Sequence, residues 1–290
     1  MAVTGVTLSK GLNQGFERER QVAIAAAESA GALLRDRFWQ THDVQLKGDG
    51  RDVLLELDLI AERAVVQQLQ SAFPDDRIYT EESGELSDRS QAHRPDIGRI
   101  WVIDPLDGSN NVAIGLTTFV VGIALCVGTE TQLGVVHEPL AGQTYWAVCG
   151  RGAYAANELI RARHVPRLRK AGPLLAWTQG HAVCRDDRRA LALRHSLELR
   201  ARRLLQLWAP LLTWSMLARG LIDGFVGYRA EGVDFPAGAL LAKEAGVELC
   251  ALDGGQFRGH LHSNDGERSF IAARPEVMPE LLRLVSATAS

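Results

Sequence analysis

The sequence has little cysteine and no long hydrophobic run, and its positive and negative charges nearly cancel. The 4 cysteines among 290 residues are scattered, so neither a disulfide scaffold nor a cysteine zinc site is expected. With 32 basic and 35 acidic residues the net charge is −3, which disfavours a protein dedicated to nucleic acid. The longest apolar run, residues 119–128, is too short to cross a bilayer, and residues 1–20 lack the apolar core of a signal peptide. We therefore expect a cytoplasmic protein without a membrane or nucleic-acid partner.

Several catalytic signatures are also missing. No Gly-x-Ser-x-Gly elbow occurs, so serine-based hydrolysis has no support. The glycines of Gly150-Arg-Gly152 lack both a Walker lysine and the dinucleotide fingerprint. The histidines form no pair of the H-x-x-x-H type. Serine hydrolases, P-loop proteins and paired-histidine metal sites are thus disfavoured.

The composition and the alternation of patterns indicate a globular α/β chain. Hydrophobic residues make up 46% and charged residues 23%, and the length predicts about two domains or one large one at about 150 residues each. We expect an N-terminal α+β half, residues 1–160, followed by a C-terminal α/β half, residues 161–290. The basic stretch Arg161–Lys170 is interpreted as solvated surface. Helices are expected over residues 17–38, 57–73, 187–199, 210–219, 236–245 and 275–286, and strands over residues 77–79, 99–103, 118–127, 132–137, 144–149, 174–178, 203–207, 224–228, 247–250 and 269–273.

The most informative stretch is Trp101-Val-Ile-Asp-Pro-Leu-Asp-Gly-Ser109. An apolar strand is expected to end at Asp104, and Asp107-Gly108 is a strong turn signal. The turn would bring two carboxylates, the Leu106 carbonyl and the Ser109 hydroxyl together, and such hard oxygen ligands suit Mg²⁺ or Mn²⁺. The N–H groups of Gly108 and Ser109 could cradle a phosphate oxygen. The alternative is an ordinary Asp-rich turn that caps a helix.

Other acidic residues follow predicted strands or begin a predicted helix. Glu81 and Glu82 follow the strand at 77–79, Asp234 follows the strand at 224–228, and Asp58 lies at the start of the second helix. Each alone would be interpreted as a helix cap or a surface carboxylate. Ligands of open α/β sheets gather at the carboxyl ends of strands, so these groups are expected to converge. Converging carboxylates repel one another unless cations neutralise them, which again predicts metal ions.

These motifs resemble those of the inositol monophosphatase family, a group of lithium-sensitive, Mg²⁺-dependent phosphatases. The run from Asp104 to Ser109 is similar to that family's Asp-Pro-Ile/Leu-Asp-Gly-Thr/Ser motif. The resemblance extends in family order from about residue 23 to residue 274. Its further parts are the pair Glu81-Glu82, Asp234 with Ala237-Gly238, and, in part, Lys47 with the segment from Asp52 to Asp58.

The resemblance implies a fold and a metal site. The fold would be the layered αβαβα sandwich of the inositol monophosphatase and fructose-1,6-bisphosphatase type, with most metal ligands in the first half of the chain. One Mg²⁺ would bind Glu81, Asp104 and the Leu106 carbonyl, and a second would bind Asp104, Asp107 and Asp234. A third ion would lie near Glu81, and Mn²⁺ could replace Mg²⁺.

The resemblance also implies the chemistry, which is hydrolysis of a phosphate monoester by a metal-activated water. Asp58 and Ser109 would orient the water, and Glu81 would hold its metal and assist deprotonation. The amides of Gly108 and Ser109, together with Asp107, would contact the substrate. Family members are commonly homodimers, so a homodimer is expected.

Four positions depart from the family pattern. Leu55 replaces a threonine, so Asp58 needs another hydrogen-bond partner, and Val233 replaces a tryptophan before Asp234. Gly227 stands where inositol phosphatases carry a glutamate. Trp208 stands where a small residue would contact the sugar, and it either packs between strand and helix or lines the pocket as a stacking surface.

The function expected from this sequence is Mg²⁺-dependent hydrolysis of a small phosphorylated alcohol or sugar, with inositol monophosphate as the default. Alternatives within the same fold are fructose-1,6-bisphosphatase, histidinol-phosphatase and 3′-phosphoadenosine 5′-phosphate phosphatase. A different class of function is that of a non-catalytic regulatory relative, which the changed residues Leu55, Val233 and Trp208 favour. Its macromolecular partner would contact basic side chains at 161–170 and 200–203.

Overall fold

A computed structural model describes residues 15–40, 43–47, 50, 52–86, 98–163 and 172–288. Residues 1–14, which bear on the expectation about a signal peptide, lie outside this part, as do residues 164–170 of the basic stretch. Within the described residues, no helix combines the length and the apolar composition that a bilayer crossing requires.

Within the described residues the larger sheet has eight strands and is antiparallel except for one pair near an edge. Its strand order is β10-β9-β8-β7-β6-β5-β3-β4, and β3 and β5 run parallel. The strands are β3 (Arg77–Thr80), β4 (Gly84–Glu85), β5 (Arg99–Asp107), β6 (Val120–Val127), β7 (Glu130–Glu138), β8 (Gln143–Val148), β9 (Ala153–Ala155) and β10 (Glu158–Ile160).

The smaller sheet has five strands in the order β12-β11-β13-β15-β14. Strand β11 runs parallel to both of its neighbours, whereas β15 is antiparallel to β13 and β14. The strands are β11 (Leu174–Gln179), β12 (Arg203–Leu205), β13 (Gly224–Tyr228), β14 (Glu248–Ala251) and β15 (Phe270–Ala273). A separate hairpin pairs β1 (Val44–Lys47) with β2 (Asp52–Leu55).

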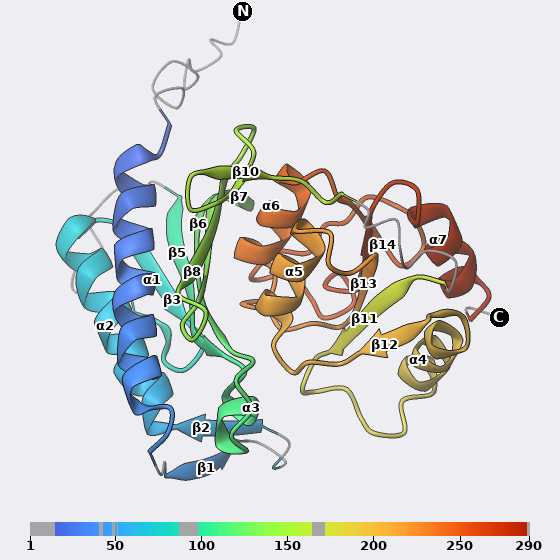
Figure 1. The fold of residues 1–290 in the computed structure, drawn as a ribbon, viewed down its shortest axis with the longest axis horizontal. Coiled ribbons are helices and arrows are strands. Elements are labelled where there is room, and N and C mark those ends of the chain that lie inside the picture. Colours follow the sequence, from blue (N-terminus) through green and yellow to red (C-terminus); the bar gives the residue numbers. More distant parts are fainter. Residues whose placement is uncertain are drawn as a thin grey trace, which may run out of the picture.

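Helices cover both sheets and fill the space between them (Figure 1). Helices α1 (Glu17–Arg37) and α2 (Glu56–Ala72) pack on the outer face of the larger sheet. Helices α5 (Pro210–Ala218) and α6 (Pro236–Glu244) lie between the sheets, and α4 (Arg188–Arg200) and α7 (Met278–Ser286) cover the smaller sheet from outside. The short helix α3 (Ser109–Ala113) follows β5. The resulting α-β-α-β-α layering confirms the predicted sandwich.

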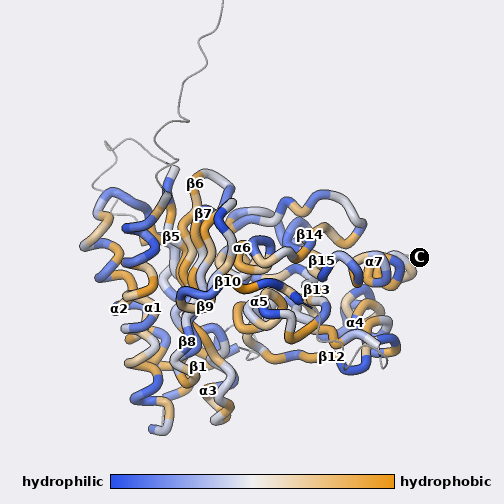
Figure 2. The backbone as a smooth tube through the Cα atoms, turned by 45° about the horizontal axis from the view of Figure 1, so that its top comes forward, coloured by the Kyte–Doolittle hydropathy of each residue, from blue (hydrophilic) through white to orange (hydrophobic). Residues whose placement is uncertain are grey.

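Small residues allow the layers to approach closely. The buried side of α1 consists mainly of alanines, and Gly31 on that helix faces the buried His137 ring of β7. On the opposite face of the sheet, a Cβ at Gly134 would lie 2.6 Å from the Ala237 carbonyl oxygen of α6. Figure 2 shows that the strands between these helices are predominantly hydrophobic. The sheet therefore carries apolar contacts on both faces, which fixes α6 relative to β7.

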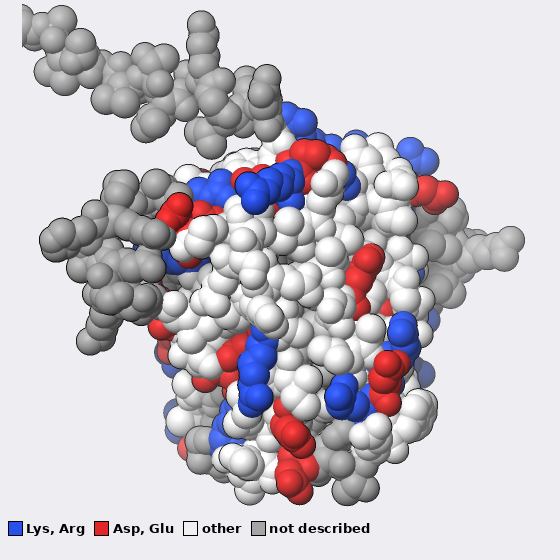
Figure 3. All heavy atoms as spheres, turned by 90° about the vertical axis from the view of Figure 1, so that its left-hand side faces the viewer, with Lys and Arg blue, Asp and Glu red and all other residues white. Residues whose placement is uncertain are grey.

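The surface over α1 and α2 carries no concentration of one charge. Figure 3 shows basic and acidic side chains interleaved on this face, with broad uncharged areas between them. Some of the charges are paired, as in the contacts of Arg20 with Glu17 and of Arg99 with Glu19 and Asp76. This face therefore lacks the single-sign field that steers a highly charged partner.

Most of the predicted elements are confirmed, and the differences are of three kinds. The strand predicted to end at Asp104 runs on to Asp107, because a bulge between these two residues accommodates the proline. Helix α7 starts at Met278 instead of residue 275. Short elements were missed, namely β1, β2, β4, β9, β10 and α3. The division into halves at residue 160 stays a proposal, since α5 contacts both sheets.

Candidate active site

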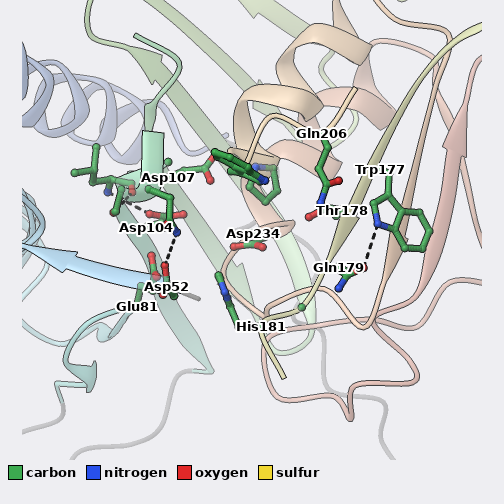
Figure 4. Close-up of a pocket in the computed structure, with 17 residues that line it drawn as sticks. Asp52, Glu81, Asp104, Asp107, Trp177, Thr178, Gln179, His181, Gln206 and Asp234 are labelled. Carbon is green, nitrogen blue, oxygen red and sulfur yellow. Dashed lines mark hydrogen bonds between the residues drawn. The ribbon is translucent and has the colours of Figure 1, made fainter. Parts of the chain in front are cut away.

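Side chains from distant parts of the chain line one cavity of about 370 Å³. Glu81, Asp104, Asp107 and Asp234 all contribute to its wall, so the structure brings together the four carboxylates that the sequence singles out. Figure 4 shows Asp52, Glu81, Asp104 and Asp107 together on one side of the cavity and Asp234 beside them. The remaining predicted site residues that line the cavity are Leu106, Gly108 and Ser109.

The parallel pairing of β3 and β5 places Glu81 beside Asp104. Thr80 and Ile103 are paired in register, and the Glu81 N–H donates to the Ile103 carbonyl at 3.0 Å. The next residue of each strand is thus a carboxylate at the same edge of the sheet. This arrangement follows the rule that ligands gather at the carboxyl ends of parallel strands.

Gly108 closes the turn after Asp107. Its φ of 107° lies in the left-handed region, and a Cβ there would be 2.8 Å from the Thr118 carbonyl oxygen. Both observations require glycine at this position. Helix α3 begins at the next residue, with Gly108 as its N-cap, so the first N–H groups of the helix open onto the cavity wall.

Asp107 connects the motif to the middle helical layer. Its Oδ2 accepts hydrogen bonds from the backbone N–H groups of Leu211 (2.7 Å) and Leu212 (3.2 Å), at the start of α5. A carboxylate is favoured at a helix N-terminus, where N–H groups have no intrahelical acceptor. Asp107 therefore uses one oxygen as a helix cap and keeps the other for the cavity.

Asp234 lies in the connection between β13 and α6. Pro236 begins α6, as expected from its fixed φ, which suits the first turn of a helix. Gly238 lies against the Trp214 ring of α5, where a side chain would overlap the indole. The contact of α5 with α6 thus fixes the segment that carries Asp234 beside the segment that carries Asp107.

The buried carboxylates have raised pKa values. Burial raises the pKa of Asp104 well above its usual value, and the charges of Glu81, Asp107 and Asp234 add to this. Burial and the charges of Asp107 and Glu81 likewise raise the pKa of Asp234. For Asp107 burial outweighs the two N–H donors from α5, and the pKa is again raised. The site therefore disfavours its own ionised form in the absence of a cation.

Lys47 is the nearby cation, and it serves a different part of the cluster. Its Nζ lies 2.5 Å from Glu82, 3.3 Å from Glu81 and 3.6 Å from Asp52. Burial alone would lower the pKa of Lys47, but these carboxylates outweigh it and raise the pKa. In the described chain the ion pairs of Lys47 do not extend to Asp104, Asp107 or Asp234, which leaves their charge without a protein counter-ion.

Asp58 lies behind the cavity wall and finds its partners without the missing threonine. Its Oδ2 accepts the Leu55 N–H at 2.6 Å, and its Oδ1 accepts the Ser109 hydroxyl at 2.5 Å. Asp58 is fully buried, and burial raises its pKa to about 7 against the effect of these two donors. The backbone N–H of Leu55 is thus one of the partners that Asp58 needs, because the leucine side chain cannot form a hydrogen bond. Asp58 and Ser109 form a buried pair whose carboxyl titrates near neutral pH.

The donor set fits a hard divalent cation. Four carboxylates and the Leu106 carbonyl are oxygen donors, and three of the carboxylates have pKa values raised by mutual repulsion and burial. Among the described residues, no three His, Cys, Asp or Glu side chains are already gathered as a complete ligand set. One reason is that Oδ2 of Asp107 accepts a hydrogen bond from the start of α5. Binding an ion therefore requires side-chain rotation within the cavity.

The other end of the cavity contains residues that sequence reasoning missed. Thr178, Gln179 and His181 come from the end of β11 and the loop after it, and Gln206 follows β12. The signal was present, since a predicted strand ends in a polar Thr-Gln-Gly-His segment at the carboxyl edge of a sheet. Trp208 also lines the cavity, with 55% of its surface exposed, so the alternative that it packs between strand and helix is wrong.

Comparisons with known proteins agree with this geometry. A protein of Pasteurella multocida named Nus factor SuhB is 30% identical over 266 residues, which cover 91% of this chain and 94% of that protein. A fructose-1,6-bisphosphatase/inositol-1-monophosphatase of Thermotoga maritima is 28% identical over 269 residues, with 91% and 94% coverage. The crystal structure of extragenic suppressor protein suhB from Bartonella henselae superposes with a TM-score of 0.78 at 26% identity, covering 92% of this chain and 98% of that chain.

A family model matches most of the chain. It is described as the inositol monophosphatase family and spans residues 17–288, which include every carboxylate of the cavity. By this match, by the relatives and by the layered fold, the chain belongs to the inositol monophosphatase family.

Proposed function

We propose that this protein hydrolyses phosphate monoesters of small alcohols or sugars with the help of Mg²⁺. The observation that carries the proposal is the convergence of Glu81, Asp104, Asp107 and Asp234 on one cavity, whose wall also includes the start of α3. Buried like charges of this kind are unfavourable unless a cation or a proton neutralises them. A site that holds cations beside N–H donors suits a phosphate ester.

Two or three ions are proposed, with Mn²⁺ as a possible substitute. Glu81, Asp104 and the Leu106 carbonyl would hold one, and Asp104, Asp107 and Asp234 would hold a second, while a third would lie near Glu81. When bound, Mg²⁺ lowers the pKa of a water ligand and neutralises charge that develops on the phosphoryl oxygens. The N–H groups of Gly108 and Ser109 would hold a phosphoryl oxygen, and Asp107 would also face the alcohol.

The buried pair of Asp58 and Ser109 is proposed to receive the proton of the attacking water. The Ser109 hydroxyl donates to Asp58 Oδ1, or alternatively to the Leu106 carbonyl at 3.0 Å, and its lone pairs can accept from a water in the cavity. The proton would pass to the Ser109 oxygen as the serine proton moves to Asp58. A carboxyl with a pKa of about 7 is suited to this exchange at neutral pH. Glu81 would assist from the cavity side.

Inositol monophosphate is the default substrate that we propose, and the name of the Thermotoga maritima relative supports both it and fructose 1,6-bisphosphate. Histidinol phosphate and 3′-phosphoadenosine 5′-phosphate complete the candidate panel. The test is phosphate release from each ester with and without Mg²⁺. Asp104→Asn should abolish Mg²⁺-dependent turnover and leave the circular dichroism spectrum unchanged, and wild-type activity in this variant would refute the proposal.

A second candidate is a binding or regulatory role on the same fold. The changes at Leu55, Val233 and Trp208 favour it, as does the name Nus factor carried by the Pasteurella multocida relative. The discriminating result is absence of turnover on the whole panel despite Mg²⁺ binding in a calorimetric titration.

Quaternary state and location stay predictions. A homodimer is tested by size-exclusion chromatography with light scattering, and a cytoplasmic location by cell fractionation.

A further inference from the structure

The cavity changes its chemical character from one end to the other (Figure 4). All of its acidic side chains lie at one end or, for Asp234, beside it. On the opposite side Thr178, Gln179 and Gln206 supply a hydroxyl and two amides, and the His181 imidazole and the exposed Trp208 indole also line the cavity.

No carboxylate serves this opposite end in the described structure. Gly227 stands at the position where the resemblance predicts a glutamate, and a Cβ there would overlap the Phe270 ring. Glu231, the nearest alternative in sequence, does not line the cavity, because its Oε1 accepts the His181 N–H at 2.8 Å and so supports the rim. A polyol donates many hydrogen bonds, and a carboxylate is an acceptor-only group that would receive them. This part of the cavity lacks such a group and offers amide and hydroxyl groups, which both donate and accept.

The backbone presents Trp208 to the cavity. Its φ of 54° lies in the left-handed region, which is unfavourable for a residue with a bulky side chain. Its neighbours hold it there, since the Asn111 Nδ2 donates to the Leu207 carbonyl at 2.7 Å and Ala209 is buried next to the start of α5. A strained residue kept in place by its surroundings at a cavity wall indicates a functional constraint. Trp208 is thus fixed as part of the wall, and 55% of the residue's surface stays exposed.

We propose that the alcohol part of the substrate carries a planar heteroaromatic ring, as in a nucleoside monophosphate, and that this ring stacks on Trp208. The inference rests on the proposed phosphatase function and specifies its substrate class. Gln179 and Gln206 supply amide groups for the edge of the ring, and the Trp177 N–H, 3.4 Å from Gln179 Oε1, orients the first of these amides. Stacking on an aromatic side chain and pairing with an amide are the usual contacts of a base.

The experiment compares esters that differ in the alcohol. The full chain with Mg²⁺ is assayed on adenosine 3′-monophosphate and adenosine 5′-monophosphate, and on myo-inositol 1-phosphate and glycerol 2-phosphate. At least one nucleotide should exceed both polyol esters by about tenfold in kcat/KM. Trp208→Ala should lower kcat/KM for that nucleotide by about tenfold, mainly through KM, and Trp208→Phe should keep it within about threefold. Calorimetric binding of adenosine alone should be lost in Trp208→Ala and kept in Trp208→Phe.

The control is Trp39→Ala, which removes an indole that is 79% exposed and does not line the cavity. It should leave the order of the four esters unchanged. Preferential hydrolysis of the polyol esters, with Trp208→Ala lowering all four equally, would overturn the inference and leave the phosphatase function standing. Absence of Mg²⁺-dependent hydrolysis of any ester would overturn the phosphatase function itself and the inference with it.

Discussion

Among single residues, Asp58 shows how burial changes the pKa of a group that is proposed to take part in catalysis. Its pKa of about 7 predicts that kcat/KM rises with pH through this value, because the ionised form accepts the proton. Asp58→Asn should lower kcat by about a hundredfold or more and abolish this acid limb. The asparagine carbonyl can still accept the Leu55 N–H, so the variant should fold. The measurement is the pH dependence of kcat/KM, with Asp36→Asn on the exposed end of α1 as the control.

The same substitution has a predicted effect on stability with a defined sign. The folded-state pKa of Asp58 lies above its unfolded value of 3.8, so the folded state binds its proton more tightly. The contribution of this carboxyl to stability is greatest below pH 3.8 and is lost as the pH rises to about 7. Asp58→Asn should therefore raise Tm at pH 8 by more than at pH 5. An equal change at the two pH values, measured by thermal melting, would contradict the assigned shift.

The side chain of Asn111 fixes two backbone carbonyl groups from different parts of the chain. Its side chain is fully buried, and its Nδ2 donates to the carbonyls of Thr118 and Leu207, both at 2.7 Å. Asn111→Ala should cost about 2 kcal/mol of unfolding free energy, because two partly buried carbonyls lose their donor. Denaturant titration measures this, with the exposed Asn157→Ala as the control. A loss no greater than that of the control would show that these carbonyls find other donors.

Sequence reasoning at this scale succeeded where the chain order carries the information. Glu81 and Asp104 each follow a strand directly, so their meeting follows from strand pairing. The partner of Asp58 was not predictable, since a backbone N–H is present at every residue and only the fold selects that of Leu55. The exposure of Trp208 depends on a positive φ, which no sequence pattern signals outside glycine and asparagine.

Among the elements, the contact between α1 and β7 depends on one glycine. A Cβ at Gly31 would overlap the His137 ring, whose Nδ1 is fixed by a 2.9 Å hydrogen bond with Thr144. Overpacking of this kind costs about 1–3 kcal/mol, against about 1 kcal/mol gained from the helix propensity of alanine. Gly31→Ala should therefore give a net loss of up to about 2 kcal/mol in denaturant unfolding. The control, Ser29→Ala, changes an exposed position of the same helix.

A stabilised Gly31→Ala variant would contradict the packing described for α1 and β7.

The long periodic helices were predictable from the sequence because one face of each is buried. The strand β1 was not, because three of its four residues are exposed and show no alternation. The extension of β5 past Asp104 was hidden by the proline, whose place in a bulge is set by the pairing with β6.

For the whole molecule, the layered sandwich determines how metal binding and pH act on stability. The metal-free protein carries buried carboxylates whose pKa values are raised, so its stability should fall as the pH rises above the unfolded value of 3.8. Mg²⁺ requires ionised ligands and displaces their protons. The increase in Tm caused by saturating Mg²⁺ should therefore be larger at pH 8 than at pH 6. Metal-free, chelator-treated protein is the reference. An increase in Tm that is larger at pH 6 than at pH 8 would contradict the raised pKa values of the buried carboxylates.

The overall layering was predictable because the motifs appear in family order over most of the chain. The opposite end of the cavity was not, because it is assembled from β11 and from the segment before α5, which meet only in the folded sheet. The residues at this opposite end would determine which substrate is chosen, whereas the acidic end would bind the metal ions.

Four distant carboxylates are proposed to share divalent ions in one cavity. An anomalous difference map from crystals of the full chain soaked in Mn²⁺ tests this. Peaks are expected among Glu81, Asp104, Asp107 and Asp234, with the Leu106 carbonyl beside one of them, and these peaks should be lost in crystals of Asp104→Asn. Saturating Mn²⁺ that gives no peak in this cavity would contradict this proposal.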